Sequence, residues 1–504
     1  MERKLSPQGA VDMAGYIRYQ IKNGVEYAVH NVARRVDGIK RDDTVNLGRV
    51  IDKQRGIFRS RERGTYSFSL ENGFQDLPNV LQKGILDFGN AFVLHQVLQK
   101  CGFIDVMKRV FGGNFDSVAA LVFYRILQGG GNSGALDWYD GSYAKALFPN
   151  ANLHSQRLSE LVKSLGDSQT TGRFFDVYLP YIKCSNAILI DSTGLPNAIN
   201  MPFTAISNHN GQVNEEARYI LIHDKENKMP IYYRGIPGNV VDVSTLTATI
   251  KELSGYGVNI DYALLDAGYS SENNVRDLFR NEIRFVTRLG SNRSIYKALR
   301  NQELPALESR ENLVKYRDRL LYIKRVESDL YGNDGFTYVA LDVDRKYSEF
   351  RNYILNKYDE ILTDEDYNSA IQNMGVFMLI SSEKMDISDV LPIYYQRQEI
   401  EQMFDISKNN AELLPLRVHD LQSFRGHLLV SFVGIVAYTL ADKLLSNSKY
   451  SLTSAFNLLR NLKITVFDEN AVVQELTKKM KEVVKHFGVA IPQSIPCGEK
   501  KAGN

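Results

Sequence analysis

The chain of 504 residues is 44% hydrophobic and carries a formal net charge of +2, so it allows two to four domains with well-filled cores but does not by itself indicate a nucleic-acid binder. Its three cysteines, at positions 101, 184 and 497, form no closely spaced pair, so neither a disulfide framework nor a zinc site is expected. The start lacks the apolar core of a secretory signal, and the longest apolar stretch, 428–441, is shorter than the about 20 residues that span a bilayer. We therefore expect a soluble, cytoplasmic protein without a membrane partner.

The first 78 residues predict a small β-rich region. Alternating β-branched and aromatic residues between glycines indicate strands near 24–31, 44–51 and 64–70. The stretch 34–63 holds ten Lys or Arg and five Asp or Glu, a local net charge of +5. A nearly neutral chain can therefore contain a cationic segment that attracts phosphate.

From residue 79 to about 185 the apolar residues adopt helical spacing. The pattern predicts helices around 92–98 and 118–127. The glycine-rich run 129–134 is predicted as a loop and not as a phosphate-binding turn, because no Lys-Ser or Lys-Thr follows it.

Strands and helices alternate next. The pattern predicts strands at 187–191, 261–266 and 283–288, a hairpin of 218–223 with 229–234, and helices from 242 to about 255 and from 271. Residues 291–374 are predicted as a β-rich insertion, and 374–380 returns to a buried strand. A long helix is expected from about Ser388, with Pro392 in its early turns, and 428–441 is predicted as a buried helix.

Two aspartates follow runs of aliphatic residues and are candidates for a site. Asp191 follows Ile188-Leu-Ile and Asp266 follows Ala263-Leu-Leu. The carboxyl ends of strands in α/β sheets are where sites are usually built, although either residue alone could simply cap a loop. Asp261 is a rival to Asp266, but it opens the same strand and would lie at the opposite end of the sheet.

A third carboxylate lies in the helix expected after Ser388. At about 100° per residue, Tyr394, Arg397, Glu401 and Lys408 fall within about 60° of one another on one face. Ile393, Ile400, Met403 and Phe404 fall on the opposite face, which can pack against the sheet. The simpler alternative is an amphipathic helix with a solvated polar face and an Arg397–Glu401 surface pair.

The spacing Tyr394-x2-Arg397-x3-Glu401-x6-Lys408 matches the Y-R-E-K signature of a large group of bacterial insertion-sequence transposases. Across about 185–445 the chain resembles this family of DDE transposases. Asp191 and Asp266 resemble the first and second catalytic carboxylates of the family. The resemblance implies an α/β fold: an RNase H-like catalytic core, a mixed five-stranded sheet with helices, interrupted by a β-rich insertion and preceded by a small β-rich region and a helical region.

The same resemblance implies the chemistry of the site. Asp191, Asp266 and Glu401 are expected to be catalytic and to hold two Mg²⁺ (or Mn²⁺) ions, because carboxylate oxygens suit these ions and a metal pair can activate one oxygen and stabilise another. Tyr394, Arg397 and Lys408 are expected to contact DNA near the scissile phosphate, since cations neutralise phosphate and an aromatic ring can stack on a base. His427 is expected to pack or to hydrogen-bond rather than to ligate a metal ion.

These inferences predict a DNA transposase that binds terminal inverted repeats and catalyses metal-dependent cleavage and strand transfer. Its partner would be double-stranded DNA, both the transposon ends and the target. A second copy of the chain is expected because two ends need two active sites. A DNA-bound protein of this kind is expected in the cytoplasm, on the nucleoid. The alternatives are a metal-dependent nuclease without strand transfer and an inactive DNA-binding relative. A metabolic α/β enzyme is disfavoured because no dinucleotide or P-loop fingerprint follows the first strand.

The predicted ranges are as follows: 1–78, a basic β-rich region that binds DNA; 79–185, a helical region that binds the DNA end; 186–290 with 375–450, the catalytic core; 291–374, the β-rich insertion; and 451–504, a C-terminal helical region and tail.

Overall fold

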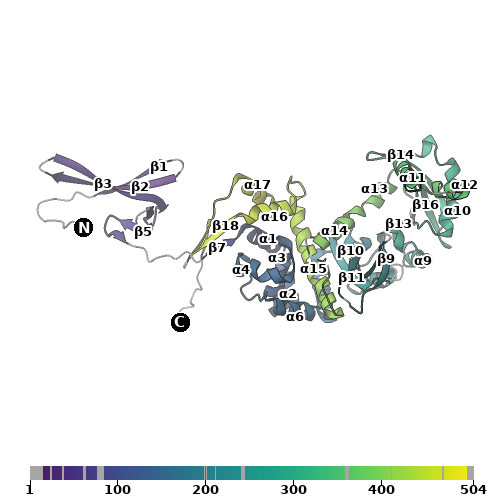
Figure 1. Cartoon of the computed structure of the whole chain (residues 1–504), viewed down its shortest axis with the longest axis horizontal. Coiled ribbons are helices and arrows are strands. Elements are labelled where there is room, and N and C mark those ends of the chain that lie inside the picture. Colours follow the sequence, from purple (N-terminus) through teal and green to yellow (C-terminus); the bar gives the residue numbers. More distant parts are fainter. Residues whose placement is uncertain are drawn as a thin grey trace. The chain divides into compact units, whose positions relative to one another are not determined.

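The computed structural model describes residues 15–22, 25–36, 39–60, 64–75, 84–197, 199, 201–209, 212–239, 245–357, 363–409, 411, 413–467 and 470–496. The chain divides into two compact units (Figure 1). The first comprises Met1–Ile85, Thr465–Val472 and Ser494–Asn504, and the second comprises Leu86–Ile464 and Val473–Gln493. This division is coarser than the five predicted ranges, whose bounds stay predictions.

The first unit contains a six-stranded antiparallel sheet in the order β1-β2-β3-β4-β5-β6. Its strands are β1 (Tyr16–Lys22), β2 (Val25–Val36), β3 (Ile39–Asp52), β4 (Ile57–Ser60), β5 (Gly64–Ser69) and β6 (Gly73–Gln75). Alternate residues point to one face and form a small core of Ala28, Leu47, Phe58, Tyr66 and Phe68. The β-rich character predicted for this region is confirmed. The side chains of 33–42 and 61–65, which hold much of the predicted basic segment, lie outside the described residues.

Helices form one side of the second unit. They are α1 (Gly89–Lys100), α2 (Phe103–Phe111), α3 (Phe115–Leu127), α4 (Ala135–Asp140), α5 (Ala144–Leu147), α6 (Ser155–Leu165), α7 (Ser168–Ile182), α15 (Leu421–Asp442), α16 (Leu452–Arg460) and α17 (Lys478–Phe487). The long helix α15 contacts α3 and α6 on one side and β11 of the large sheet on the other (Figure 1). It is buried along most of its length, as predicted for 428–441.

Two helical stretches among the described residues, 103–127 and 421–445, are long and apolar enough to cross a membrane. In their most apolar windows, however, 72% and 78% of the residues are buried inside the protein. Core helices of soluble proteins have this character too. The second stretch is longer than the apolar run in the sequence because polar residues extend α15 at both ends.

A ten-stranded sheet forms the other side of the second unit. Its order is β11-β10-β8-β12-β13-β17-β16-β15-β14, and β9 also pairs with β10. The strands are β8 (Ala187–Pro196), β9 (Ala205–His209), β10 (Gln212–Asp224), β11 (Met229–Pro237), β12 (Tyr262–Leu265), β13 (Arg284–Arg288), β14 (Leu313–Tyr316), β15 (Arg319–Asp329), β16 (Asp334–Asp342) and β17 (Val376–Ser381). Only β8–β12 and β12–β13 pair in parallel; the other pairs of neighbours are antiparallel. The central strands β12 and β17 are buried, which explains their continuous apolar runs.

The remaining helices of this unit flank the sheet and lead to the site: α8 (Leu246–Gly255), α9 (Glu272–Arg280), α10 (Ser294–Glu303), α11 (Val343–Lys357), α12 (Asp364–Ile371), α13 (Val390–Tyr395) and α14 (Gln398–Asn409). A separate sheet has the order β20-β19-β18-β7, from β7 (Gly84–Asp87), β18 (Lys463–Val466), β19 (Asn470–Val473) and β20 (Ser494–Pro496).

The mixed α/β class is confirmed, and three details differ from the predictions. The sheet has ten strands instead of five. The pairing of β16 with β17 brings β14, β15 and β16 of the predicted insertion into it, and β9 joins it by pairing with β10. The C-terminal region contains strands as well as helices. The single long helix expected from Ser388 is wrong: α13 ends at Tyr395 and α14 begins at Gln398.

Candidate active site

Asp191 and Asp266 lie side by side at one edge of the large sheet. In the parallel pairing of β8 with β12, Ile190 is opposite Leu265; Asp191 is the next residue of β8, and Asp266 directly follows the last residue of β12. Asp191 does not end its strand as the sequence suggested, since β8 continues along β10 to Pro196 after β12 has ended. Asp261 lies at the other end of β12, where it pairs with Arg284 at 3.4 Å. The preference for Asp266 over Asp261 therefore agrees with the geometry.

One guanidinium group joins the two aspartates to the predicted third acid. Arg397 Nη1 is 2.9 Å from Asp191 Oδ2 and 3.3 Å from Asp266 Oδ1. Its other terminal nitrogen, Nη2, is 3.0 Å from Glu401 Oε1. The structure thus brings together four of the six residues predicted for the site. Asp191 belongs to β8 and Asp266 follows β12, while Arg397 directly precedes α14 and Glu401 lies in its first turn. Residues 191 and 401 are far apart in sequence, so a surface pair within one helix does not account for this cluster.

The other two predicted residues flank this group. The Tyr394 side chain, at the end of α13, is buried with 6% exposure, and its ring centre is 5.9 Å from the Arg397 guanidinium carbon. Lys408, near the end of α14, donates from Nζ to Thr193 Oγ1 at 2.7 Å. Thr193 is two residues after Asp191 and therefore on the same face of β8.

The interruption between α13 and α14 positions Arg397 away from a regular helix. The amide of Arg397 donates to the Tyr394 carbonyl, a tight turn with an i to i+3 bond. The amphipathic character predicted for the following helix is confirmed on its apolar side, where Ile400 is fully buried and Phe404 is 7% exposed. The Phe404 ring lies 6.4 Å from the Tyr219 ring of β10, which anchors α14 on the sheet.

Burial and charge act in opposite directions on this cluster. The pKa of Asp191 is raised to about 7, mainly because the carboxyl group is buried; the charges of Asp266 and Glu401 also raise this pKa, and the charge of Arg397 opposes the rise. Burial by itself would lower the pKa of Arg397, but the surrounding carboxylates, Asp191 first among them, raise it overall. The charge of Arg397 therefore does not offset the effect of burial on the pKa of Asp191.

The donor set fits a divalent cation by its chemistry. Three ionised carboxylates with one guanidinium leave a net charge of −2, which one divalent ion would neutralise, and carboxylate oxygens are the ligands that Mg²⁺ prefers. In the part of the chain that the structure describes, no three His, Cys, Asp or Glu residues are close enough to ligate one ion. The reason is visible in the distances: Arg397 spans the acids, with two of them at one terminal nitrogen and the third at the other.

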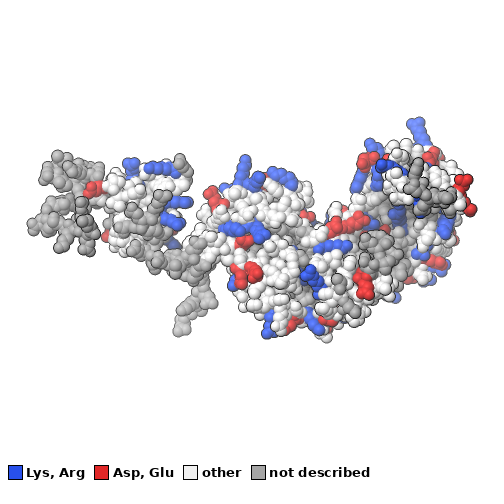
Figure 2. Space-filling model, viewed as in Figure 1, with Lys and Arg blue, Asp and Glu red and all other residues white. Residues whose placement is uncertain are grey.

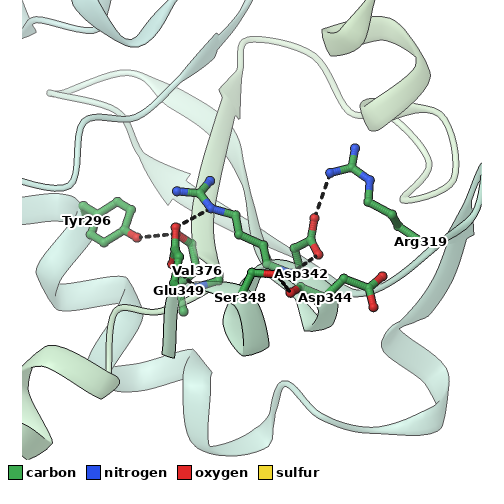
Figure 3. Close-up of polar contacts among 9 residues, drawn as sticks. Tyr296, Arg319, Asp342, Asp344, Ser348, Glu349 and Val376 are labelled. Atoms are coloured by element: carbon green, nitrogen blue, oxygen red, sulfur yellow. Dashed lines mark hydrogen bonds and ion pairs between the residues drawn. The ribbon is translucent and has the colours of Figure 1, made fainter. Parts of the chain in front are cut away.

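A cavity of about 150 Å³ adjoins Arg397 and Glu401 and contains residues that the sequence did not suggest. Arg319 of β15 and Arg345 of α11 line it together with Asp342, the last residue of β16. Arg319 Nη1 donates to Asp342 Oδ2 at 2.9 Å (Figure 3). The backbone nitrogen of Arg345 donates to the same carboxylate at 3.0 Å. These residues were missed because only the pairing of β16 with β17 brings them to the site.

The family model described as "Transposase DDE domain" matches residues 183–438. No curated protein matches. Among solved structures, a piggyBac transposase in a synaptic complex with hairpin DNA is 12% identical, with a TM-score of 0.39, and the similarity covers 76% of this chain and 80% of that chain.

Proposed function

This chain belongs to the family of transposases with a DDE domain, and from that premise we propose that Asp191, Asp266 and Glu401 are its catalytic carboxylates. The observation that carries the proposal is their convergence on Arg397, with all three within 3.3 Å of its terminal nitrogens. The matched family range contains all three acids and the strands and helix that carry them.

The reaction that we propose is cleavage of a phosphodiester at the end of a mobile element, followed by transfer of the released 3′ end to a second DNA. Divalent ions bound by the carboxylates, two per site and Mg²⁺ or Mn²⁺, would supply activation of the attacking oxygen and stabilisation of the leaving oxygen. The fold brings the three acids to one place and leaves their side chains exposed to different degrees. The Asp191 side chain is 13% exposed, whereas that of Glu401 is 54% exposed and faces the solvent from which DNA would arrive.

Arg397 and Lys408 would act on the DNA and not on the bond itself. Both are half-buried cations within the site, and a phosphate group offers them an acceptor that their present partners only partly replace. The Tyr394 ring packs near the Arg397 guanidinium and is buried in this structure. The Tyr394 side chain would therefore have to become exposed before its ring could contact a base. We further propose that the chain is of the Y-R-E-K group with an RNase H-like core, acts on terminal inverted repeats and works as a homodimer on the nucleoid.

The first test replaces each acid by its amide. Asp191→Asn, Asp266→Asn and Glu401→Gln should each reduce Mg²⁺-dependent cutting of a duplex that carries the element's inverted repeat by at least about 10³-fold, while DNA binding changes little. Asp261→Asn is the matched control, because it alters the same strand at its other end and should cut normally. Normal cutting by any of the three amide variants would remove that residue from the catalytic set.

The alternative of a nuclease without strand transfer shares every residue of this site. Only a covalent joint between the element's end and a target plasmid, detected on a denaturing gel, separates the two activities. Cut ends without joints, at a concentration of plasmid where cutting is complete, would favour the nuclease.

A further inference from the structure

A second, larger cleft of about 710 Å³ lies beside the carboxylate site in the same unit. Its lining starts at Ala267 and Gly268, directly after Asp266, and continues through the loop between β13 and α10. The opposite wall comes from α11, from Asn373 and from the start of β17. The cleft therefore belongs to one compact unit and is formed from described residues only.

The lining carries a large excess of positive charge. It contains five cations, Arg288, Arg293, Lys297, Arg300 and Arg345, and one carboxylate, Glu349, a net charge of +4. Glu349 is already engaged: it accepts from Arg345 Nε at 2.6 Å and from the backbone nitrogen of Gly375 at 2.8 Å. This neutral Arg345–Glu349 pair is close to Tyr296, whose hydroxyl is held by the Val376 carbonyl (Figure 3).

The other four cations have no compensating acid among the described residues. Arg288, Arg293 and Lys297 make no side-chain hydrogen bond or ion pair there, and Nε of Arg293 is buried without an acceptor. Arg300 is bound only by neutral amides, with Nη1 at 2.6 Å from Asn373 Oδ1. Elsewhere on the face of this unit shown in Figure 2, Lys and Arg are interspersed with Asp and Glu. Four uncompensated cations in one cleft repel one another, and a bound anion would relieve that repulsion.

The cleft is continuous with the catalytic cavity. Arg288, Arg345 and Phe377 line both cavities, and Arg397 and Glu401 line the smaller one. A phosphodiester strand with one phosphate at the carboxylates would therefore place the following phosphates among the cations of the cleft.

Resting on the proposed function, we infer that this cleft binds the backbone phosphates of the DNA strand that continues past the scissile phosphate. The contacts are to phosphate oxygens, so the cleft holds the strand without selecting its sequence. Arg293 and Lys297 are the principal phosphate contacts, because their charges are uncompensated among the described residues. Arg293 lies in the loop directly before α10, and Lys297 lies in the first turn of that helix.

The test is a binding measurement in EDTA, which needs no catalysis. Anisotropy of a fluorescein-labelled oligodeoxythymidylate of about 12 nucleotides is followed from 50 to 300 mM KCl with the full chain. For Arg293→Ala/Lys297→Ala we expect a salt slope, log K against log [KCl], that is shallower by about 1.4 and an affinity about tenfold lower at 100 mM KCl. The control Arg157→Ala/Lys346→Ala removes the same charge from two cations already paired with Glu160 and Glu308, and should leave both values unchanged.

A second variant protects the test against misfolding. Lys297→Glu changes an exposed side chain without described partners and should weaken binding more than Lys297→Ala does. An unchanged salt slope in the double variant, or equal losses in variant and control, would overturn the inference. Competition by tripolyphosphate that the double variant abolishes, with an unchanged oligonucleotide slope, would assign the cleft to a small polyanion instead. Failure of the wild type to bind any DNA would overturn the proposed function as well, whereas failure of cutting alone would leave this measurement valid.

Discussion

Arg397 contacts all three acids in this structure and offsets one of their three charges. Its two terminal nitrogens contact Asp191, Asp266 and Glu401, and its side chain is 15% exposed. Removing the guanidinium would leave three carboxylates facing one another with no internal cation. Their mutual repulsion would then be relieved only by protons or by metal ions.

We therefore expect Arg397→Gln to bind Mn²⁺ at least about tenfold more tightly than the wild type, because a nearby positive charge opposes a divalent cation in a site of low dielectric. Titration calorimetry without DNA measures this affinity directly. Arg157→Gln, which removes a cation from the surface of α6, is the control and should leave the affinity as it was. A weaker site in Arg397→Gln would mean that the arginine holds the acids in a geometry that the ion requires.

His427 shows how a buried residue makes stability depend on pH. Burial, with a smaller contribution from Arg125, lowers its pKa to about 3 from the ordinary 6.5. Its Nε2 lies 3.1 Å from the Leu413 carbonyl and its Nδ1 lies 3.4 Å from Arg125 Nη2, an arrangement that suits the neutral ring. The prediction that this histidine packs or hydrogen-bonds agrees with its burial and its contacts.

Because the folded pKa of His427 is below the unfolded one, its contribution is complete above pH 6.5 and is lost as the pH falls towards 3. Between these two pKa values the unfolded chain binds a proton that the native chain does not. The free energy of unfolding therefore falls by about 1.4 kcal/mol for each unit by which the pH is lowered. His223, with a pKa of about 4, adds a second slope of the same sign. Urea unfolding between pH 7.5 and 5 should thus show a smaller loss in His427→Gln than in the wild type; parallel curves would contradict the assignment.

At the scale of elements, α6 and α15 cross closely, and α15 in turn packs against the helix that carries part of the site. A Cβ on Gly426 would lie 1.7 Å from the Val162 carbonyl, and a Cβ on Gly166 would lie 1.7 Å from the Gln422 carbonyl. Both obstacles are backbone atoms, so the helices would have to separate. α15 also contacts α14, the helix that carries Glu401 and Lys408.

Gly426→Ala should therefore destabilise the protein by about 1–3 kcal/mol or more and lower its melting temperature, as overpacking does elsewhere. Gly255→Ala, at the end of α8, is the matched control because nothing lies within 4 Å of its added Cβ. Thermal unfolding followed by circular dichroism compares the two. Equal melting temperatures would show that α6 and α15 are not as closely packed as these distances indicate.

The helix around Glu401 also shows what a sequence can and cannot predict. Hydrophobic spacing correctly placed Ile400 and Phe404 on the buried face, since this depends only on residues within about two turns. It did not predict the interruption between Tyr395 and Gln398, because no glycine or proline marks it. The interruption is a turn with i to i+3 hydrogen bonds, and Arg397, which lies in it, contacts Asp191 and Asp266.

At the scale of the whole molecule, long-range pairing decides which predicted elements meet. Asp191 and Asp266 could be expected at one sheet edge because both follow apolar runs, and parallel pairing confirms their adjacency. Residues 283–302, which form one wall of the basic cleft, hold five Lys or Arg and no Asp or Glu, a charge that can be read from the sequence. The opposite wall cannot be read from it, because Arg345 and Asn373 reach the cleft only through the antiparallel joining of β16 to β17.

The β-sheet of residues 15–75 offers the last test, since it has its own core within the first unit. The sequence predicts that this region, with its net charge of +5 over 34–63, contacts DNA. Deleting residues 1–78 should leave the thermal transition of the second unit in place while lowering duplex affinity and the steepness of its salt dependence. Cutting of a short preformed end at saturating protein should persist, because every proposed catalytic residue lies beyond residue 185. If the truncated chain binds duplex with an unchanged salt slope, the phosphate contacts lie elsewhere, and the basic cleft beside Asp266 becomes the principal site of attachment.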